Sequence, residues 1–234
     1  MAHAVRIYAE DDELLGTVVP FLAEGLAAGD PAVVIARRAH LEAIEARLAE
    51  PKLHVTADAD DTLAAISSDA GVTHADFERV VGGMLDLATA ELPGRAPRVY
   101  GEMVDVLVER GETWQALALE VMWNALAETR SFDLLCAYRL DVFERGPQLM
   151  PLPDVCRLHT HAQLAGDPER FSHAVEGALE EVLGASEVGK VYMLAADRDH
   201  DRVPLAQLAL MWVSANMPVL SERILASARR RYAA

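Results

Sequence analysis

Glu102, Glu120 and Asn124 are polar residues that stand where a strand or an inward helix face would otherwise be apolar. Burying such groups costs free energy unless each finds a partner. Glu102 lies near the end of a predicted strand, and ligands in open α/β sheets bind beyond the carboxyl ends of the strands. Glu120 and Asn124 share one face of a predicted helix. We expect the three to face a common space, where they either contact a ligand or form a purely structural hydrogen-bond network.

Four further residues complete the predicted ligand-binding pocket. Trp123 and Tyr138 add to its wall, and His3 and Tyr8, which flank the first predicted strand, lie near its mouth. A histidine in such a place can contact a ligand or respond to pH. The alternative for His3 is a loop residue whose ring bonds to nearby backbone groups.

Cys156, His159 and His161 are of types that bind zinc or haem iron. A helix would place Cys156 and His159 on one face and His161 elsewhere, so a zinc site would need a further ligand such as Cys136 or an acid. The alternative is a segment that packs on the sheet through Cys156. We favour packing, and therefore expect no metal ion and no cofactor.

The sequence contains no familiar catalytic motif. A P-loop needs Gly-x-x-x-x-Gly-Lys-[Ser/Thr], and neither Lys52 nor Lys190 lies in a glycine-rich loop after a strand. No Gly-x-Ser-x-Gly elbow follows a predicted strand. We therefore expect a protein that is not an enzyme. The alternative is a hydrolase or transferase that uses Glu102 as its base.

Charge and composition exclude several classes of partner. The 234 residues carry a formal net charge of −16, which repels phosphate backbones and anionic lipids. We therefore expect neither direct nucleic-acid binding nor membrane docking, and no apolar run is long enough for a transmembrane helix. Two cysteines do not make a disulfide framework, which favours a reducing cytoplasm.

Predicted strands and helices alternate along the chain, at intervals long enough for crossover connections. This pattern predicts an α/β fold with a mostly parallel sheet covered by helices on both faces. The predicted strands are Val5–Tyr8, Ala32–Ala36, Leu53–Ala57, Val99–Val104, Asp133–Leu140 and Lys190–Ala196. The predicted helices are Asp11–Ala28, Ala39–Glu50, Thr62–Ser67, His74–Glu91, Thr113–Arg130, Asp154–Ala162, Pro168–Leu183 and Pro204–Arg231.

Pieces spread from Ala2 to Ala162 together resemble the MEDS domain, a sensory domain of methanogen and methylotroph signalling proteins and of dichloromethane-responsive regulators. The resemblance implies descent from RecA/KaiC-type ATPases, and hence a RecA-like three-layer sandwich without a P-loop. It also implies a signal-input module of histidine kinases, transcription regulators and anti-sigma pathways. The matching pieces are His3–Tyr8, Phe21–Asp30, Val33–Ala36 with His40, Asp58-Ala59, Thr62-Leu63, Gly101–Val104, Leu119-Glu120, Trp123-Asn124, Leu135–Tyr138, and Cys156 with His159 and His161.

We therefore expect residues 1–162 to form a MEDS-like sensory domain, and residues 163–234 to form an α/β extension packed on the same body. The expected function is a cytoplasmic domain that binds a small molecule and passes its state, by a population shift, to a kinase, a sigma-pathway protein or a transcription regulator. A ligand-free scaffold that only binds a protein is the alternative. The apolar face of the predicted helix Pro204–Arg231 suits either core packing or a homodimer.

Overall fold

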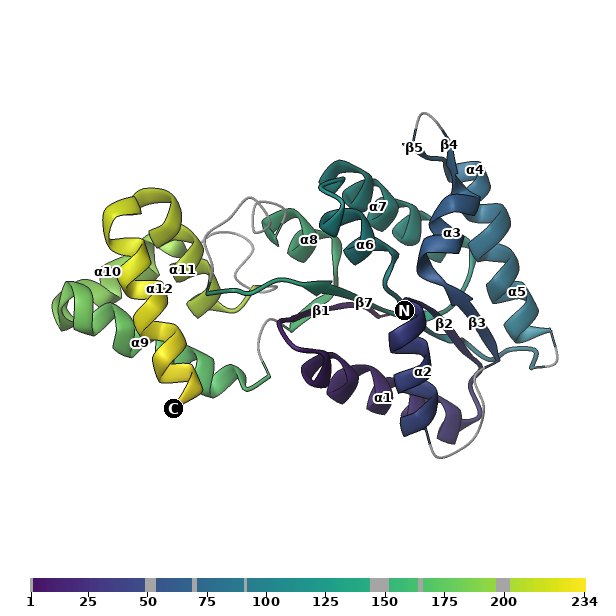
Figure 1. Ribbon diagram of the computed structural model, residues 1–234, viewed down its shortest axis with the longest axis horizontal. Helices are drawn as coiled ribbons and strands as arrows, with labels where there is room; N and C mark the ends of the chain where they lie inside the picture. The colour runs from purple at the N-terminus through teal and green to yellow at the C-terminus, as the bar shows by residue number, and fades with distance from the viewer. Residues whose placement is uncertain are drawn as a thin grey trace.

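A six-stranded parallel sheet forms the centre of the molecule (Figure 1). The computed structural model describes residues 2–48, 54–68, 71–90, 92–143, 152–163, 166–196 and 203–234. Neighbouring strands run parallel in the order β3-β2-β6-β7-β1-β8. The strands are β1 (His3–Tyr8), β2 (Ala32–Ala36), β3 (Val55–Asp58), β6 (Arg98–Gly101), β7 (Asp133–Arg139) and β8 (His161–Gln163).

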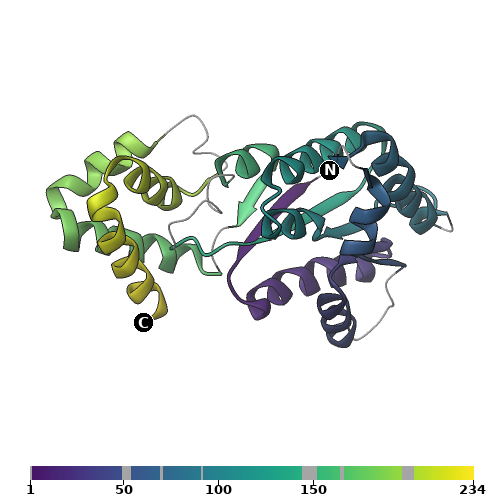
Figure 2. The ribbon, with the colours of Figure 1, turned by 45° about the horizontal axis from the view of Figure 1, so that its top comes forward.

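Helices cover both faces of this sheet, which confirms the predicted α/β three-layer sandwich (Figure 2). Alternate strand residues point to opposite faces. One set packs against helices α1 (Asp11–Ala28) and α2 (Arg38–Arg47). The other set packs against a larger group of helices that extends along the opposite face. That group comprises α3 (Ala59–Ile66), α4 (His74–Phe77), the π-helical turn η1 (Glu78–Gly82), α5 (Gly83–Thr89), α6 (Met103–Glu109), α7 (Thr113–Thr129) and α8 (Leu152–Leu158).

The register brings the carboxyl ends of four strands to one edge of the sheet. Tyr8 at the end of β1 pairs with Arg139 at the end of β7. Ile35 near the end of β2 pairs with Gly101 at the end of β6. Residues that directly follow these strands therefore meet at one edge, as the topology of parallel sheets requires.

Strand β6 is shorter than predicted, because the chain turns into a helix after Glu102. We predicted a strand through Val104, but β6 ends at Gly101 and α6 begins at Met103. All residues from Met103 to Val108 are buried. The sequence here therefore shows neither the alternation typical of a half-buried strand nor the 3.6-residue period typical of an amphipathic helix. The correction makes Glu102 the first residue of a strand-to-helix turn.

Other predicted elements differ in length or continuity. The predicted helix His74–Glu91 is interrupted by η1, and the residues before it form a hairpin of β4 (Ser67–Ser68) and β5 (Gly71–Val72). The predicted helix Asp154–Ala162 ends at Leu158 and gives way to β8. Within the described residues no helix combines the length and apolar character needed to cross a membrane.

The described residues after β8 form four helices that lie beside the sheet, in the green to yellow part of Figure 1: α9 (Pro168–Leu183), α10 (Ala185–Ala195), α11 (Leu205–Asn216) and α12 (Pro218–Ala233). The predicted strand Lys190–Ala196 is wrong. Val188, Val191 and Ala195 are buried at helical spacing, while Met193 and Leu194 face outward. The acidic segment that follows, residues 197–201, has a composition typical of a surface loop and lies outside the described residues.

The predicted helix Pro204–Arg231 is two helices, because Pro218 occupies the first turn of α12. Leu208 of α11 is buried among the four helices, whereas Leu205 is partly exposed and Val219 is largely exposed. Phe143, which follows β7, contacts the rings of Phe171 and Tyr232, with centroid distances of 5.4 and 5.6 Å. Packing therefore accounts for much of the apolar face. The domain division at residue 162 stays a prediction.

Candidate functional site

A cavity of about 430 Å³ opens at the carboxyl edge of the sheet, within the size range of small-molecule sites. Four elements supply its walls: α1, the start of α2, helix α6 and the end of β7. We call this space the carboxyl-edge cavity. Its lining residues are Asp11, Arg37, His40, Asp105, Val108, Glu109, Arg139 and Leu140.

Glu102 lies beneath this cavity and is fully buried. The backbone N–H of Arg37 donates to Glu102 Oε2 at 2.8 Å, and Arg37 Nη1 donates to Oε1 at 2.6 Å. His40 Nδ1 lies 2.6 Å from the same Oε1. Burial alone would raise the pKa of Glu102, but the hydrogen bonds and charges of His40 and Arg37 outweigh it and lower that pKa. The carboxylate is therefore ionised and positions both basic side chains.

Asp105, on the first turn of α6, connects Arg37 to the ends of β1 and β7. Its Oδ2 accepts from Arg37 Nη1 at 2.7 Å and from the Tyr8 hydroxyl at 3.2 Å. Its Oδ1 accepts from the backbone N–H of Arg139 at 2.7 Å. Burial raises the pKa of Asp105, and burial with the adjacent carboxylates raises that of Tyr8. The Tyr8 hydroxyl therefore keeps its proton and donates a hydrogen bond to Asp105.

The rim of the carboxyl-edge cavity carries charges of both signs. Arg139 pairs with Asp11 and lies over the Tyr8 ring, 5.5 Å from its centroid. Asp11 also approaches His40 Nε2 at 3.4 Å, and Glu109 accepts from Arg37 Nη2 at 2.7 Å. Asp11, Glu109 and Arg139 are half-exposed or more, so solvent or a ligand can replace their contacts.

Arg37, His40, Asp105 and Arg139 were not among the predicted site residues. Arg37 follows a fully buried strand, and Arg139 is the last residue of another. The carboxyl-edge rule applied to every strand would have found both. Asp105 directly follows the predicted strand Val99–Val104, so the same rule would have found it as well.

Glu120 belongs to a second cluster, built on the face of the sheet that α7 covers. Its Oε1 accepts from the Tyr138 hydroxyl at 2.6 Å, and its Oε2 lies 3.2 Å from His3 Nε2. Asn124 contacts His3 Nδ1 through Oδ1 at 2.9 Å. Burial would raise the pKa of Glu120, but the nearby His159, His3 and Tyr138 lower it to about 2. The carboxylate is ionised although no part of it reaches solvent.

The predicted pocket residues therefore do not share one space. Glu102 and Tyr8 belong to the carboxyl-edge cavity, whereas Glu120, Asn124, His3 and Tyr138 make their contacts within the second cluster. Trp123 lies in the apolar core between Phe77 and Phe132, at centroid distances of 5.1 and 5.8 Å. Glu120 and Asn124 contact side chains of β7 and β1, whereas Glu102, beyond the end of β6, contacts Arg37 and His40.

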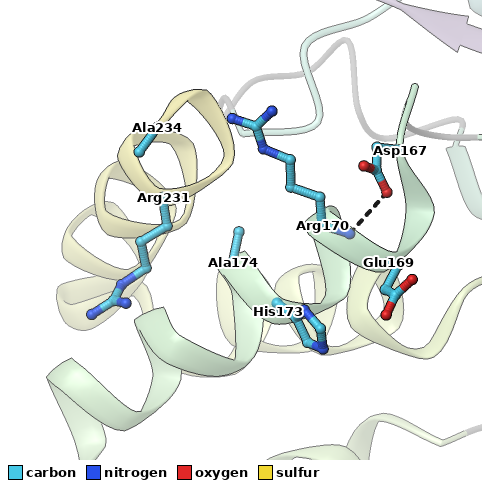
Figure 3. A pocket seen from close by; sticks show the side chains of 7 residues that line it. All are labelled: Asp167, Glu169, Arg170, His173, Ala174, Arg231 and Ala234. Atoms are coloured by element: carbon cyan, nitrogen blue, oxygen red, sulfur yellow. Dashed lines mark hydrogen bonds between the residues drawn. The ribbon is translucent and has the colours of Figure 1, made fainter.

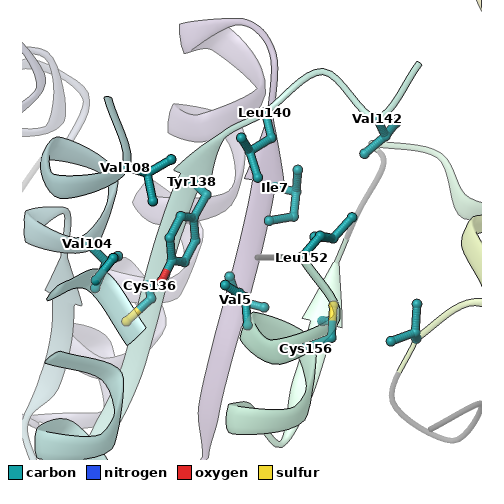
Figure 4. Packing of buried hydrophobic residues seen from close by; sticks show 14 of the residues in the cluster. Val5, Ile7, Val104, Val108, Cys136, Tyr138, Leu140, Val142, Leu152 and Cys156 are labelled. Carbon is teal, nitrogen blue, oxygen red and sulfur yellow. The ribbon is translucent and has the colours of Figure 1, made fainter. Parts of the chain in front are cut away.

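Of the predicted metal candidates, only His159 joins the second cluster. Its Nε2 lies 3.4 Å from Glu120 Oε1. His161 is exposed on β8. Cys156 is buried, but Figure 4 shows it on the far side of β1 from Cys136. Figure 4 also shows Cys136 and the Tyr138 ring on the same face of the sheet as α6.

A larger hollow of about 510 Å³ lies between α9 and α12 (Figure 3). Asp167, Glu169, Arg170 and His173 line it, and all four are exposed. Asp167 accepts from the backbone N–H of Arg170 at 3.0 Å and so caps α9. No buried polar side chain faces this hollow among its described lining residues. We therefore regard the carboxyl-edge cavity, with its buried carboxylates, as the better site.

Comparison with known proteins adds one match. Residues 2–160 match the family model described as MEDS, the MEthanogen/methylotroph, DcmR Sensory domain. The match spans about two-thirds of the chain and contains every residue that lines the carboxyl-edge cavity. No curated protein and no solved structure matches the chain at a significant level.

Proposed function

Because the chain belongs to the MEDS family of sensory domains, we propose that it binds a small polar molecule in the carboxyl-edge cavity and relays the bound state to a signalling partner. The partner is a kinase, a sigma-pathway protein or a transcription regulator. The observation that carries the ligand site is the ring of Arg37, His40 and Arg139 around a cavity of small-molecule size, above the fully buried Glu102.

The lining of the cavity indicates the chemistry of the ligand. Arg37 is already bound by three carboxylates, those of Glu102, Asp105 and Glu109. In the described part of the chain, the Arg139 side chain pairs with one carboxylate, that of the exposed Asp11, so a ligand can take over that contact at little cost. A small molecule with a hydroxyl, carboxylate or other oxygen acceptor suits Arg139, and an apolar part of it suits Val108 and Leu140.

Binding, and not turnover, is the proposed activity. A general base works best when its pKa lies near the working pH. The contacts with His40 and Arg37 lower the pKa of Glu102 and occupy both of its oxygens. These contacts make Glu102 a poor base but a good support for the basic residues at the cavity.

The relay would use the elements that meet at the cavity. Arg139 is the last residue of β7, and Asp11 is the first residue of α1. A ligand that replaces the ion pair between them would change the relative free energies of two states, one with the end of β7 held to the start of α1 and one with the two released. A ligand shifts such an equilibrium only by its differential affinity for the two states. The partner would read the resulting change in population.

A thermal-shift screen tests this proposal. We expect small oxygen-containing molecules to stabilise the wild type, by about 2.7 kcal/mol at about 100 times Kd. The same molecules should not stabilise Arg139→Gln, which keeps the buried Glu102–Arg37 contacts. A screen in which no small molecule stabilises the wild type would favour the ligand-free scaffold.

A further inference from the structure

Four side chains of metal-binding type converge in the second cluster. The ligand atoms of His3, Glu120, Cys136 and His159 all lie within 4.8 Å of one another, and all four residues are buried. They come from β1, α7, β7 and the segment after α8, which are far apart in the sequence. The fold has thus brought two imidazoles, a carboxylate and a thiol together in a place that solvent does not reach.

Hydrogen bonds on the outer side of each imidazole fix which nitrogen carries the proton. Asn124 Nδ2 donates to the Leu158 carbonyl at 3.1 Å, which turns Asn124 Oδ1 toward His3 Nδ1 as an acceptor. His159 Nδ1 lies 2.6 Å from the Val155 carbonyl. Both Nδ1 atoms must therefore donate. In the neutral rings, each Nε2 carries a lone pair that points into the cluster.

The centre of the cluster has more acceptors than donors. When both rings are neutral, the two Nε2 atoms and the carboxylate oxygens of Glu120 are all acceptors. Among the described residues, the Tyr138 hydroxyl already donates to Glu120 at 2.6 Å, and Cys136 Sγ supplies one weak donor 3.5 Å from Glu120 Oε2. His159 Nε2 has no hydrogen-bond partner in the described part of the chain. A buried group of acceptors is stabilised by a cation at its centre.

The separations between the acceptor atoms match those around a tetrahedral metal ion. A Zn²⁺ ion with bonds of about 2.0–2.3 Å holds its ligand atoms about 3.3–3.8 Å apart. His3 Nε2 lies 3.2 Å from Glu120 Oε2 and 3.5 Å from Cys136 Sγ, and that Sγ lies 3.5 Å from Glu120 Oε2. These three atoms form one face of such a tetrahedron. His159 Nε2 lies 3.4 Å from the other Glu120 oxygen, Oε1, and the ligand atoms of all four residues lie within 4.8 Å of one another, which makes His159 the candidate for the remaining corner.

We propose that His3, Glu120, Cys136 and His159 bind one divalent transition-metal ion of the borderline class to which Zn²⁺ belongs. Mixed nitrogen, sulfur and oxygen ligands suit this class. Asn124, Val155 and Tyr138 are the outer partners that hold the ligands in place. On binding, the Cys136 thiol loses its proton to solvent and coordinates as the thiolate.

Four protein ligands in a closed site leave no position for substrate, so the metal has a structural or regulatory role. It would join the start of β1, the middle of β7 and the segment after α8. Strand β7 ends at Arg139, which lines the carboxyl-edge cavity. The metal site therefore goes beyond the proposed function and can be tested without knowing the ligand of that cavity.

Metal titration of the purified full chain tests the proposal. After treatment with a chelator, the protein is titrated with Zn²⁺ against a chromophoric chelator, and separately with Co²⁺. We expect uptake of one ion per chain, a thiolate-to-Co²⁺ charge-transfer band, and the strong visible bands of tetrahedral Co²⁺. A wild type that takes up no stoichiometric metal would overturn the proposal.

The chain offers a matched control for each of two ligands. Cys136→Ser should abolish the charge-transfer band, and His159→Gln should weaken Zn²⁺ binding more than about 100-fold, beyond the usual effect of an outer partner. Cys156→Ser and His161→Gln, which change residues outside the group of four, should bind as the wild type does. Far-ultraviolet circular dichroism checks that each variant folds. Equal losses in a variant and its control would assign the metal to another site.

Discussion

Glu102 shows how a single carboxylate organises the carboxyl-edge cavity. It is fully buried and accepts hydrogen bonds from the Arg37 backbone and side chain, with His40 Nδ1 2.6 Å away. The sequence predicted that Glu102 lies near the carboxyl end of a buried strand, and the structure places it directly after β6. Its partners were not, because Arg37 and His40 lie more than sixty residues away along the chain and reach it only through the pairing of β2 with β6.

The contact between His40 and Glu102 predicts a pH-dependent stability. The hydrogen bond that His40 donates to the Glu102 carboxylate, together with the charges of Glu102 and Asp11, raises the pKa of His40 above 6.5 despite its burial. The stabilisation by charged His40 is therefore complete below pH 6.5 and is lost as the pH rises through the folded pKa. The pKa of Glu102 is lowered, so its contribution is present above pH 4.5 and is lost as the pH falls through its folded pKa.

Urea denaturation of the wild type and His40→Gln checks this prediction. The difference in unfolding free energy should be largest between pH 4.5 and 6.5 and should shrink as the pH rises further. His173→Gln, at an exposed histidine of α9, should show no such trend. A difference that stays constant across this pH range would show that folding does not raise the pKa of His40, contrary to the prediction.

Elements were predictable where the apolar pattern has a clear period. The range of α1 was predicted correctly, because Leu14, Val18 and Leu22 recur at helical spacing in the sequence. The structure buries these three residues on the face of the sheet that α1 and α2 cover. Helix α6 was missed because its residues from Met103 to Val108 are all buried, so the sequence shows no polar face at helical spacing. Helix α10 was missed because Met193 and Leu194, which are exposed, extend its apolar residues into a strand-like run.

Two glycines of α1 provide a test of its packing. Gly16 is exposed and an added Cβ would meet no atom within 4 Å, so Gly16→Ala should stabilise the protein by about 0.5–1 kcal/mol through helix propensity. Gly25 is buried, and a Cβ there would overlap the side chain of Arg98, which lies over the Phe21 ring. Gly25→Ala should therefore lower the unfolding free energy in the same urea assay. Equal effects of the two substitutions would contradict this packing of α1 against β6.

At the scale of the whole molecule, side chains that directly follow β7 contact the helices after β8. Phe143 contacts Phe171 and Tyr232, and Arg229 Nη2 donates to Asp141 at 2.7 Å. The sequence predicted that residues 163–234 pack on the same body, but not through which side chains, because these contacts join residues far apart in the chain. The expected strand in this region is absent from the described residues, which are helical after β8.

Cooperative unfolding tests whether this contact makes one body. We expect a single calorimetric transition for the wild type. Phe143→Ala removes the shared ring contacts and should separate the unfolding of the helices from that of the sheet. Leu194→Ala, at an exposed position on α10, serves as the control. A wild type that already unfolds in two steps would mean that the two parts fold independently.

The central claim is that the small-molecule signal enters at the carboxyl edge of the sheet. The most direct test is calorimetric titration of the best-stabilising molecule from the screen into the wild type, Arg139→Gln and Arg170→Gln. Arg170 lines the larger hollow between α9 and α12, so its variant is the control for that competing site. Arg139→Gln removes one charged hydrogen bond to the ligand, which is worth about 1.5–3 kcal/mol, so we expect its Kd to rise at least tenfold. We expect Arg170→Gln to bind as the wild type does. Unchanged binding in Arg139→Gln, or a loss confined to Arg170→Gln, would contradict the account.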